Sequence, residues 1–196
     1  MISKKRLRRI KRQFRAVAQT LFLWGYRAIA RTAQKLHMAH SISQKRAEFL
    51  KENFLELSFQ DRKPDRAVFD SITDPAELHY LADIHNWDDG VEVLSWIIDS
   101  PYCDWGTAAL VFWRSQPDFY TEYAQESEMS LPDGTLSLLK RIMRNWERGF
   151  YVRQQIAYNH SEDPAAEKDY GNNPRRKWQI PPYLIKPTAG KPFLFA

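Results

Sequence analysis

The stretch Asn86–Trp113 constrains the fold most, because it marks the ends of two helices explicitly. Asp89 can accept a hydrogen bond from the first turn of a helix, and Glu92 stands three residues later, at the spacing of a capping box. Pro101 disfavours helical geometry in the residue before it and therefore ends that helix. Asp104 can then cap a second helix that begins at the next residue. The stretch predicts two helices joined by a tight corner.

Similar signals recur along the chain, and no segment has the apolar–polar alternation of a β-strand. Asp74 precedes a proline at a first helical position, and Ser41 and Ser43 are both candidates to cap an earlier helix. Gly149 interrupts the last apolar pattern and marks a break or kink in it. We therefore predict an all-α fold, a compact bundle of short antiparallel helices. The expected helices of the bundle cover residues 44–57, 74–85, 90–99, 105–115, 116–123 and 135–159.

The chain is predicted to have three parts. Residues 1–60 form a basic N-terminal helical arm, residues 67–160 a helical domain, and residues 161–196 an extended, proline-rich tail packed on that domain. Pro64 lies in the polar linker after the arm. The single cysteine excludes an internal disulfide and a cysteine-rich zinc site. No run approaches the roughly 20 apolar residues that span a bilayer.

The net charge of +5 conceals a division between the parts. Residues 1–46 contain 13 Lys or Arg and no Asp or Glu. Residues 70–139 contain 14 Asp or Glu and one basic residue, Arg114. The basic isoelectric point of the whole chain is therefore a property of the arm, while the body is acidic. Such asymmetry indicates partners of different charge for the two parts.

The start of the arm carries more cations than packing requires. Three functional interpretations stay open: a helix on an anionic membrane surface, a phosphate-binding arm for nucleic acid, and a targeting signal. The alternative is that the apolar face of the arm packs on the body while its charges remain in solvent. The residues that would bind an anion or lipid are Lys4, Lys5, Arg6, Arg8, Arg9, Lys11, Arg12 and Arg15.

Acidic side chains and tryptophans lie together in the two-helix stretch. Trp96, Trp113 and Trp146 are expected in the core, whereas Trp87 and Trp105 stand at helix starts beside acidic residues. Aromatic side chains within a charged surface are what a protein-binding hot spot needs. We predict that this surface binds a basic protein partner, with the contact residues Trp87, Asp88, Asp89, Glu92, Asp99, Asp104 and Trp105.

The same stretch resembles a bacterial family catalogued as domain of unknown function 4274, over residues 70–160. The resemblance implies a small, helical, cytoplasmic bacterial protein, with peripheral membrane association if the arm binds lipid. Several small acidic families of this kind are immunity proteins beside toxin genes, which is analogy and not chemistry. The segment 149–158 also resembles the continuation in longer members. The residues that carry the resemblance are Asn86, Trp87, Asp88, Gly90, Pro101, Cys103, Asp104, Gly106, Thr107, Ala108 and Trp113.

A metal site is the first chemical alternative. His79 and Asp83 are four residues apart on one helical face and could act as a pair of ligands. His85 faces elsewhere, and Asp88 and Asp89 are expected to cap a helix. Short motifs of this kind are frequent by chance, so we predict no metal site and no cofactor.

Catalysis is the second alternative. Carboxylates can act as a general acid and base only if burial and neighbours tune them, which a sequence does not show. Cys103 lies near a helix start that favours a thiolate, but a lone cysteine is more often a small buried apolar group. The carboxylates considered for catalysis are Asp83, Asp88, Glu92 and Asp104.

The leading prediction is a non-enzymatic protein-binding module of the immunity-inhibitor type that uses its acidic surface. The second is a membrane-surface or nucleic-acid adaptor that acts through the basic arm. The third is an enzyme that uses the acidic cluster, for which a deep pocket holding His79, Asp83 and Asp88 would be evidence.

Overall fold

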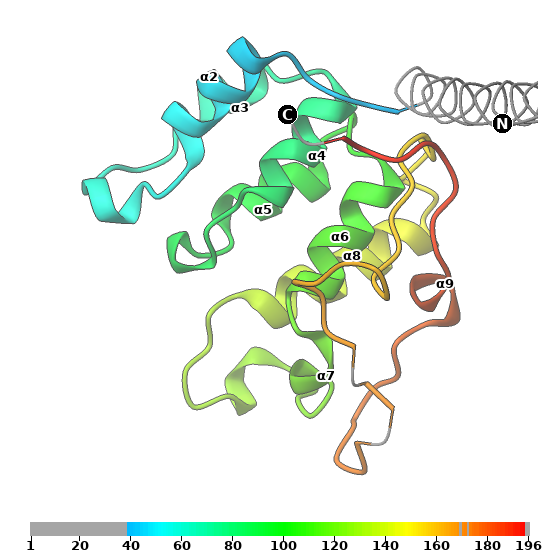
Figure 1. The fold of residues 1–196 in the computed structure, drawn as a ribbon. Coiled ribbons are helices and arrows are strands. Elements are labelled where there is room, and N and C mark those ends of the chain that lie inside the picture. The colour runs from blue at the N-terminus through cyan, green and yellow to red at the C-terminus, as the bar shows by residue number, and fades with distance from the viewer. Residues whose placement is uncertain (1–38, 169, 172, 195–196) are drawn as a thin grey trace, which may run out of the picture. The chain divides into compact units, whose positions relative to one another are not determined.

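The computed structural model of the protein describes residues 39–168, 170–171 and 173–194. Within these ranges the chain forms eight α-helices and no β-strand (Figure 1), which confirms the predicted all-α fold. The cations of the arm at residues 4–15 lie outside the described residues. The helices are α2 (Gln44–Phe54), α3 (Arg66–Asp70), α4 (Pro75–Asp83), α5 (Glu92–Asp99), α6 (Trp105–Arg114), α7 (Pro117–Tyr120), α8 (Thr135–Glu147) and α9 (Pro182–Ile185), with single 3₁₀ turns η1 (Ser58–Gln60), η2 (Trp87–Asp89) and η3 (Glu126–Glu128).

Most predicted helix boundaries are confirmed, because short-range hydrogen bonds define them. Ser43 caps α2, with its side chain accepting from the backbone N–H of Arg46. Asp74 caps α4 by accepting from the N–H of Ala76, and α4 begins with a proline. Asp104 caps α6, and α5 ends at the residue before Ser100.

The capping box predicted at Asp89 is wrong. Helix α5 begins at Glu92 after Val91, and no side chain caps it. The carboxylate of Asp89 instead accepts hydrogen bonds from the backbone N–H groups of Leu57 and Ser58, 3.1 and 2.9 Å away. The loop after α2, which is distant in the sequence, therefore donates to the carboxylate that the local pattern assigned to the start of α5.

Helix α2 is part of the body, although the prediction placed the arm boundary at residue 60. The compact unit that contains it begins at His40. Arg46 donates two hydrogen bonds of 2.7 Å to the carboxylate of Glu77 on α4. Leu50 and Phe54, one and two turns further along the same side of the helix, are buried in the core. Burial of this apolar face is what fixes α2 on α4.

The predicted helix over residues 135–159 is wrong in its second half. Helix α8 ends at Glu147, and Gly149 has a φ of 68°, which an L-residue adopts with strain. The chain then returns as an extended segment along the start of α6, where the carbonyl oxygen of Arg153 accepts from the N–H of Trp105. The helix therefore ends just before Gly149, where the sequence predicted a break or kink.

The described part of the C-terminal tail is hydrogen-bonded to the body. Ala157 donates to the carbonyl oxygen of Lys191, and Leu194 donates to that of His40, at 2.9 and 2.8 Å. Figure 1 shows these segments running along one side of the body, past α6. The prolines of the tail were expected to exclude regular structure, but Pro182 begins the short helix α9.

Helix α6 lies at the centre of the core. All of its residues from Trp105 to Trp113 are buried, and α4, α5 and α8 pack against it. Trp113 stacks on His160, with ring centroids 3.9 Å apart, and its indole N–H donates to the carbonyl oxygen of Leu184. Trp113 is thus in the core, as predicted, and the partly buried Trp96 packs against the core. No helix in the described part of the chain has the length and apolarity that crossing a bilayer requires.

Candidate functional site

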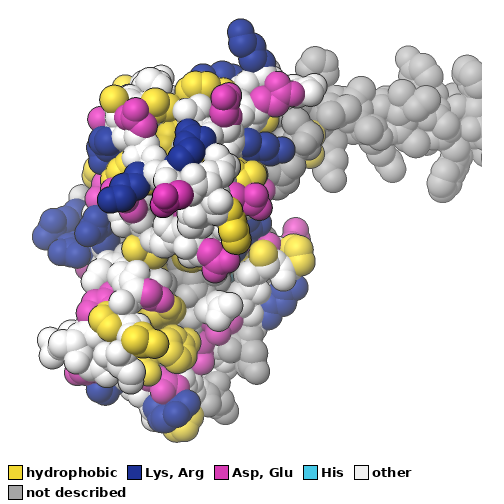
Figure 2. Space-filling model, turned by 90° about the vertical axis from the view of Figure 1, so that its left-hand side faces the viewer, with side chains coloured by type: hydrophobic (Ala, Val, Ile, Leu, Met, Phe, Trp, Pro, Cys, Tyr) yellow, Lys and Arg dark blue, Asp and Glu magenta, His cyan; other side chains and the backbone are white. Residues whose placement is uncertain are grey.

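A cleft of about 490 Å³ opens between four segments of the acidic body. We call it the aromatic cleft, because Trp87 and Phe119 line it and are 36% and 50% exposed. On the face drawn in Figure 2, hydrophobic side chains gather over the α7–α8 region and acidic side chains lie beside them. The residues of the aromatic cleft are Trp87, Gly90, Val91, Arg114, Ser115, Gln116, Phe119, Tyr120, Asp133 and Thr135.

The loop that carries Trp87 is held from behind by a buried histidine. The Nε2–H of His85 donates to the carbonyl oxygen of Gly90, 2.8 Å away, so the neutral ring carries its proton on Nε2. Burial lowers the pKa of His85 and keeps the ring neutral. Gly90 has a φ of 76°, which lets the loop turn before α5. The edge of the His85 ring meets Trp87, which fixes the indole at the cleft.

The facing wall comes from the turn between α6 and α7. Gln116 has a φ of 51°, a left-handed conformation that is uncommon for a residue with a side chain. This turn allows α7 to start at once with a proline and places Phe119 over the cleft. The hydroxyl of Tyr120 donates to Asp133, 2.8 Å away. Burial raises the pKa of Asp133, but the hydrogen bonds from Thr135 and Tyr120 outweigh it, and the net pKa is lowered.

Arg114 lies between this cleft and a second cavity, and two carboxylates hold its guanidinium. Its Nε donates to Asp163 and its Nη2 to Asp83, both at 2.7 Å. Burial raises the pKa of Asp83, and the attraction of the single guanidinium offsets this only in part. Burial also acts on Asp163, but hydrogen bonds from Arg114 and Ala165 leave its pKa lowered. The only basic residue of segment 70–139 is therefore neutralised by its neighbours.

The structure divides the predicted partner-binding residues among three places. Trp87 lines the aromatic cleft, and the neighbouring Asp88 and Glu92 are exposed. Asp89 is turned towards the loop after α2, where hydrogen bonds from Ser58 and Leu57 outweigh burial and lower its pKa. Asp99 lies at the other end of α5 and pairs with Arg141 of α8.

The surface role predicted for Asp104 and Trp105 is wrong, because both side chains are buried. Asp104 is 0% exposed and accepts from the N–H groups of Gly106, Gln155 and Ile156. Trp105 is 3% exposed and packs on Trp146, with ring centroids 4.1 Å apart. Both residues fix the extended segment after α8 to the start of α6.

Sequence reasoning missed Phe119, Tyr120 and Asp133 as residues of the site. Phe119 and Tyr120 lie within the helix predicted over residues 116–123, and Asp133 lies between two predicted helices. Their only sequence signal is membership of the acidic segment 70–139, because the cleft forms from segments that are distant in the chain.

Evidence for an enzyme would be a single deep pocket that holds His79, Asp83 and Asp88, and the structure brings only two of these residues together. His79 and Asp83 both line a cavity of about 360 Å³, but Asp88 does not. His79 is 2% exposed, its Nδ1 lies 3.1 Å from the hydroxyl of Thr107, and burial lowers its pKa to about 3. His79 is therefore a neutral core histidine at physiological pH. In the described residues, no three His, Cys, Asp or Glu side chains come together as metal ligands would.

Cys103 is a buried apolar group. Its side chain is 3% exposed, and burial raises the pKa of the thiol well above its ordinary value. A thiol in this state is a poor nucleophile. The interpretation of Cys103 as a small core residue is confirmed.

Residues 73–147 match the model of a family described as a domain of unknown function, DUF4274. The match runs from the start of α4 to the end of α8 and confirms the resemblance seen in the sequence. No curated protein and no solved structure matches the chain.

Proposed function

We propose a non-enzymatic role for this protein, whose residues 73–147 match the DUF4274 family model: it binds a basic protein at the aromatic cleft. The observation that carries the proposal is the pair of exposed aromatic side chains, Trp87 and Phe119, on the walls of one cleft in an acidic body. Apolar side chains of this size rarely stay exposed together without a partner. They would supply the anchor of an interface.

Charge supports a basic partner. Segment 70–139 carries 14 acidic residues, and its single cation, Arg114, is already paired with Asp83 and Asp163. The remaining field is negative and would steer a basic protein towards the cleft. Asp88 and Glu92 are exposed beside Trp87 and can form the charged rim of the interface.

An immunity-type inhibitor is the concrete form of this proposal. Such a protein neutralises a toxin by covering it, which needs fast association and a well-anchored interface. Electrostatic steering supplies the first and the aromatic pair the second. Association that slows as salt concentration rises is the signature to expect.

The test is retention of partner proteins by the full-length chain from a lysate of the native host. We expect Trp87→Ala with Phe119→Ala to weaken retention of a basic protein about 30-fold, as loss of hot-spot side chains does. The matched control is Phe59→Ala with Phe150→Ala, which removes two exposed aromatic side chains outside the cleft. Equal retention by the two double variants, at low and at physiological salt, would contradict the proposal.

The composition of the arm favours a second function, binding of an anionic membrane. Residues 1–46 hold 13 basic residues and no acidic one. Each basic residue near an anionic surface adds about 1 kcal/mol of binding free energy. We expect the full chain to sediment with phosphatidylserine vesicles at least tenfold more than a variant in which the cations of residues 4–15 are glutamine. Binding of duplex DNA in place of vesicles would identify a nucleic-acid adaptor, and binding of neither would remove this second function.

A further inference from the structure

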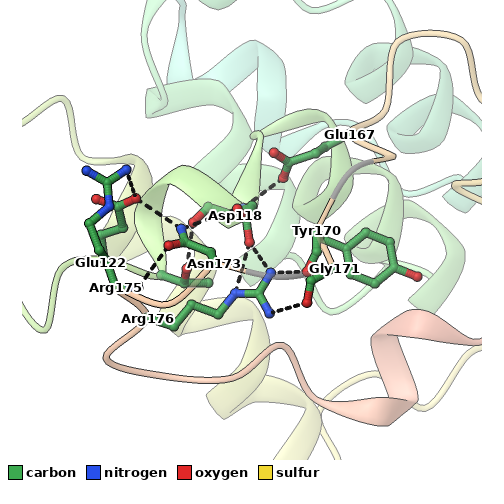
Figure 3. Close-up of polar contacts among 9 residues, drawn as sticks. Asp118, Glu122, Glu167, Tyr170, Gly171, Asn173, Arg175 and Arg176 are labelled. Carbon is green, nitrogen blue, oxygen red and sulfur yellow. Dashed lines mark hydrogen bonds and ion pairs between the residues drawn. The ribbon is translucent and has the colours of Figure 1, made fainter.

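A basic segment of the C-terminal tail covers the acidic surface next to the aromatic cleft. We call residues 173–178 the strap. Its three cationic side chains each pair with one carboxylate of the surface formed by α7 and the segment up to η3. Figure 3 shows two of these pairs, with the strap lying against α7. The ion pairs are Arg176 with Asp118, Arg175 with Glu122 at 2.7 Å, and Lys177 with Glu128 at 2.8 Å.

The strap binds as an extended peptide would. Its backbone N–H at Lys177 donates to the carbonyl oxygen of Thr121, 2.7 Å away. The indole N–H of Trp178 lies 3.1 and 3.2 Å from the carbonyl oxygens of Tyr120 and Tyr123. The cationic side chains of the strap thus pair with carboxylates. The main-chain N–H of Lys177 and the indole N–H of Trp178 face carbonyl oxygens at and just after the end of α7. A foreign basic segment with an aromatic residue can make the same set of contacts.

The strap is attached by its three ion pairs and by the partly buried Trp178, and open space adjoins it on two sides. A cavity of about 500 Å³ adjoins it at Asn173 and Arg176, and another of about 620 Å³ lies between it and Phe119. In two of its ion pairs the cation is exposed, with side-chain accessibilities of 76% at Arg175 and 50% at Lys177, whereas the third pair, Arg176 with Asp118, is mostly buried. Exposed pairs contribute little to stability and are screened by salt. The strap is therefore easier to displace than the buried segments around it.

Phe119 connects the strap to the proposed binding site. This side chain lines both the aromatic cleft and the cavity beside the strap. A protein bound at Phe119 would meet the strap at the edge of its interface. While the strap is docked, it neutralises Asp118, Glu122 and Glu128, the carboxylates that would attract a basic partner on that side.

We propose that the strap is a built-in competitor of the partner: it occupies the acidic surface beside the cleft and leaves when a basic segment binds there. This inference rests on the proposed function and adds its regulation. The docked strap lowers the affinity of the site, because binding and strap docking exclude each other. The partner class is a segment of the strap's own kind, with neighbouring arginine or lysine residues and an aromatic side chain.

The test follows hydrogen exchange of residues 173–180 in the full-length chain, with the L-peptide Arg-Arg-Lys-Trp, the sequence of residues 175–178, as the probe. Because the amide of Lys177 is hydrogen-bonded only while the strap is docked to Thr121, its exchange reports docking directly. We expect the probe to accelerate this exchange about tenfold and to leave the amides of α2 unchanged. Arg175→Gln with Lys177→Gln should bind the probe about tenfold more tightly, since two exposed pairs are removed.

The matched control is Lys51→Gln with Lys63→Gln, which makes the same change in net charge at exposed residues of other segments. It should bind the probe no more tightly than the wild type. Binding of the probe without faster exchange and without tighter binding by the strap variant would overturn the strap inference and leave the proposed function intact. If the probe bound neither the wild type nor the strap variant, both the strap inference and the proposed function would be contradicted.

Discussion

Gly106→Ala is expected to destabilise the protein by about 3 kcal/mol or to prevent folding. A methyl group at this position would overlap the carbonyl oxygen of Ile156. That oxygen belongs to the backbone and is held on both sides, because the hydroxyl of Thr188 donates to it and the adjacent N–H donates to Asp104. The clash can be relieved only by moving the extended segment away from α6, which would break these hydrogen bonds.

The measurement is urea unfolding of the wild type and two variants. The matched control is Gly171→Ala, because a methyl group there would meet nothing within 4 Å. We expect its free energy of unfolding to stay within about 0.5 kcal/mol of the wild type. Equal midpoints for Gly106→Ala and Gly171→Ala would show that the contact of α6 with Ile156 is not required.

Several residues that carry the family resemblance lie around Gly106, and their contacts give them a structural role. Asp104 caps α6 and accepts from the returning segment, and Thr107 lies 3.1 Å from the ring nitrogen of His79. These positions join α4, α6 and the segment after α8 into one core. These residues of the family motif thus form a structural junction, and the proposed site lies elsewhere, with only Trp87, Gly90 and the rim residue Asp88 in common with the motif.

The sequence allowed prediction of those features that depend on neighbours in the chain. The caps at Ser43, Asp74 and Asp104 were found because the donors lie two or three residues away. Asp89 has the same local pattern, but its carboxylate accepts from the N–H groups of Leu57 and Ser58, which lie about 30 residues away in the sequence. Nothing in the local pattern distinguishes the two cases.

Burial could be predicted only where periodicity is unambiguous. Ile156 is buried as expected, but Val152, which was expected on the same buried side, is 77% exposed, because an extended segment and not a helix carries both residues and short apolar runs fit either structure. Trp105 was taken for a surface residue because acidic residues precede it. Its partners, Trp146 and Tyr183, come from α8 and α9, and only the fold brings them together. The aromatic cleft escaped prediction for the same reason.

Arg114→Met is expected to lower the free energy of unfolding by about 3 kcal/mol at neutral pH, as removal of one partner from a buried ion pair does. Arg114 joins the last turn of α6 to Asp83 at the end of α4 and to Asp163 in the tail, and all three side chains are mostly buried. Methionine preserves much of the apolar volume but leaves two carboxylates without a cation. The control is Arg141→Met, whose pair with Asp99 is exposed and should change stability by at most about 0.5 kcal/mol.

The loss caused by Arg114→Met should depend on pH, and the sign follows from proton binding. In the wild type, Asp163 has a lowered pKa, so its contribution is present above the pKa of the unfolded chain and is lost as pH falls. In the variant, burial raises the pKa of Asp83 and Asp163 without opposition from a guanidinium, so the folded state takes up protons more readily than the unfolded state. The variant should therefore gain stability relative to the wild type from about pH 7 to about pH 5, and the difference between them should narrow. Urea unfolding of both proteins across this pH range measures the difference in their free energies of unfolding. A difference that stays constant with pH would mean that the substitution destabilises the protein through altered packing and not through loss of the compensating charge.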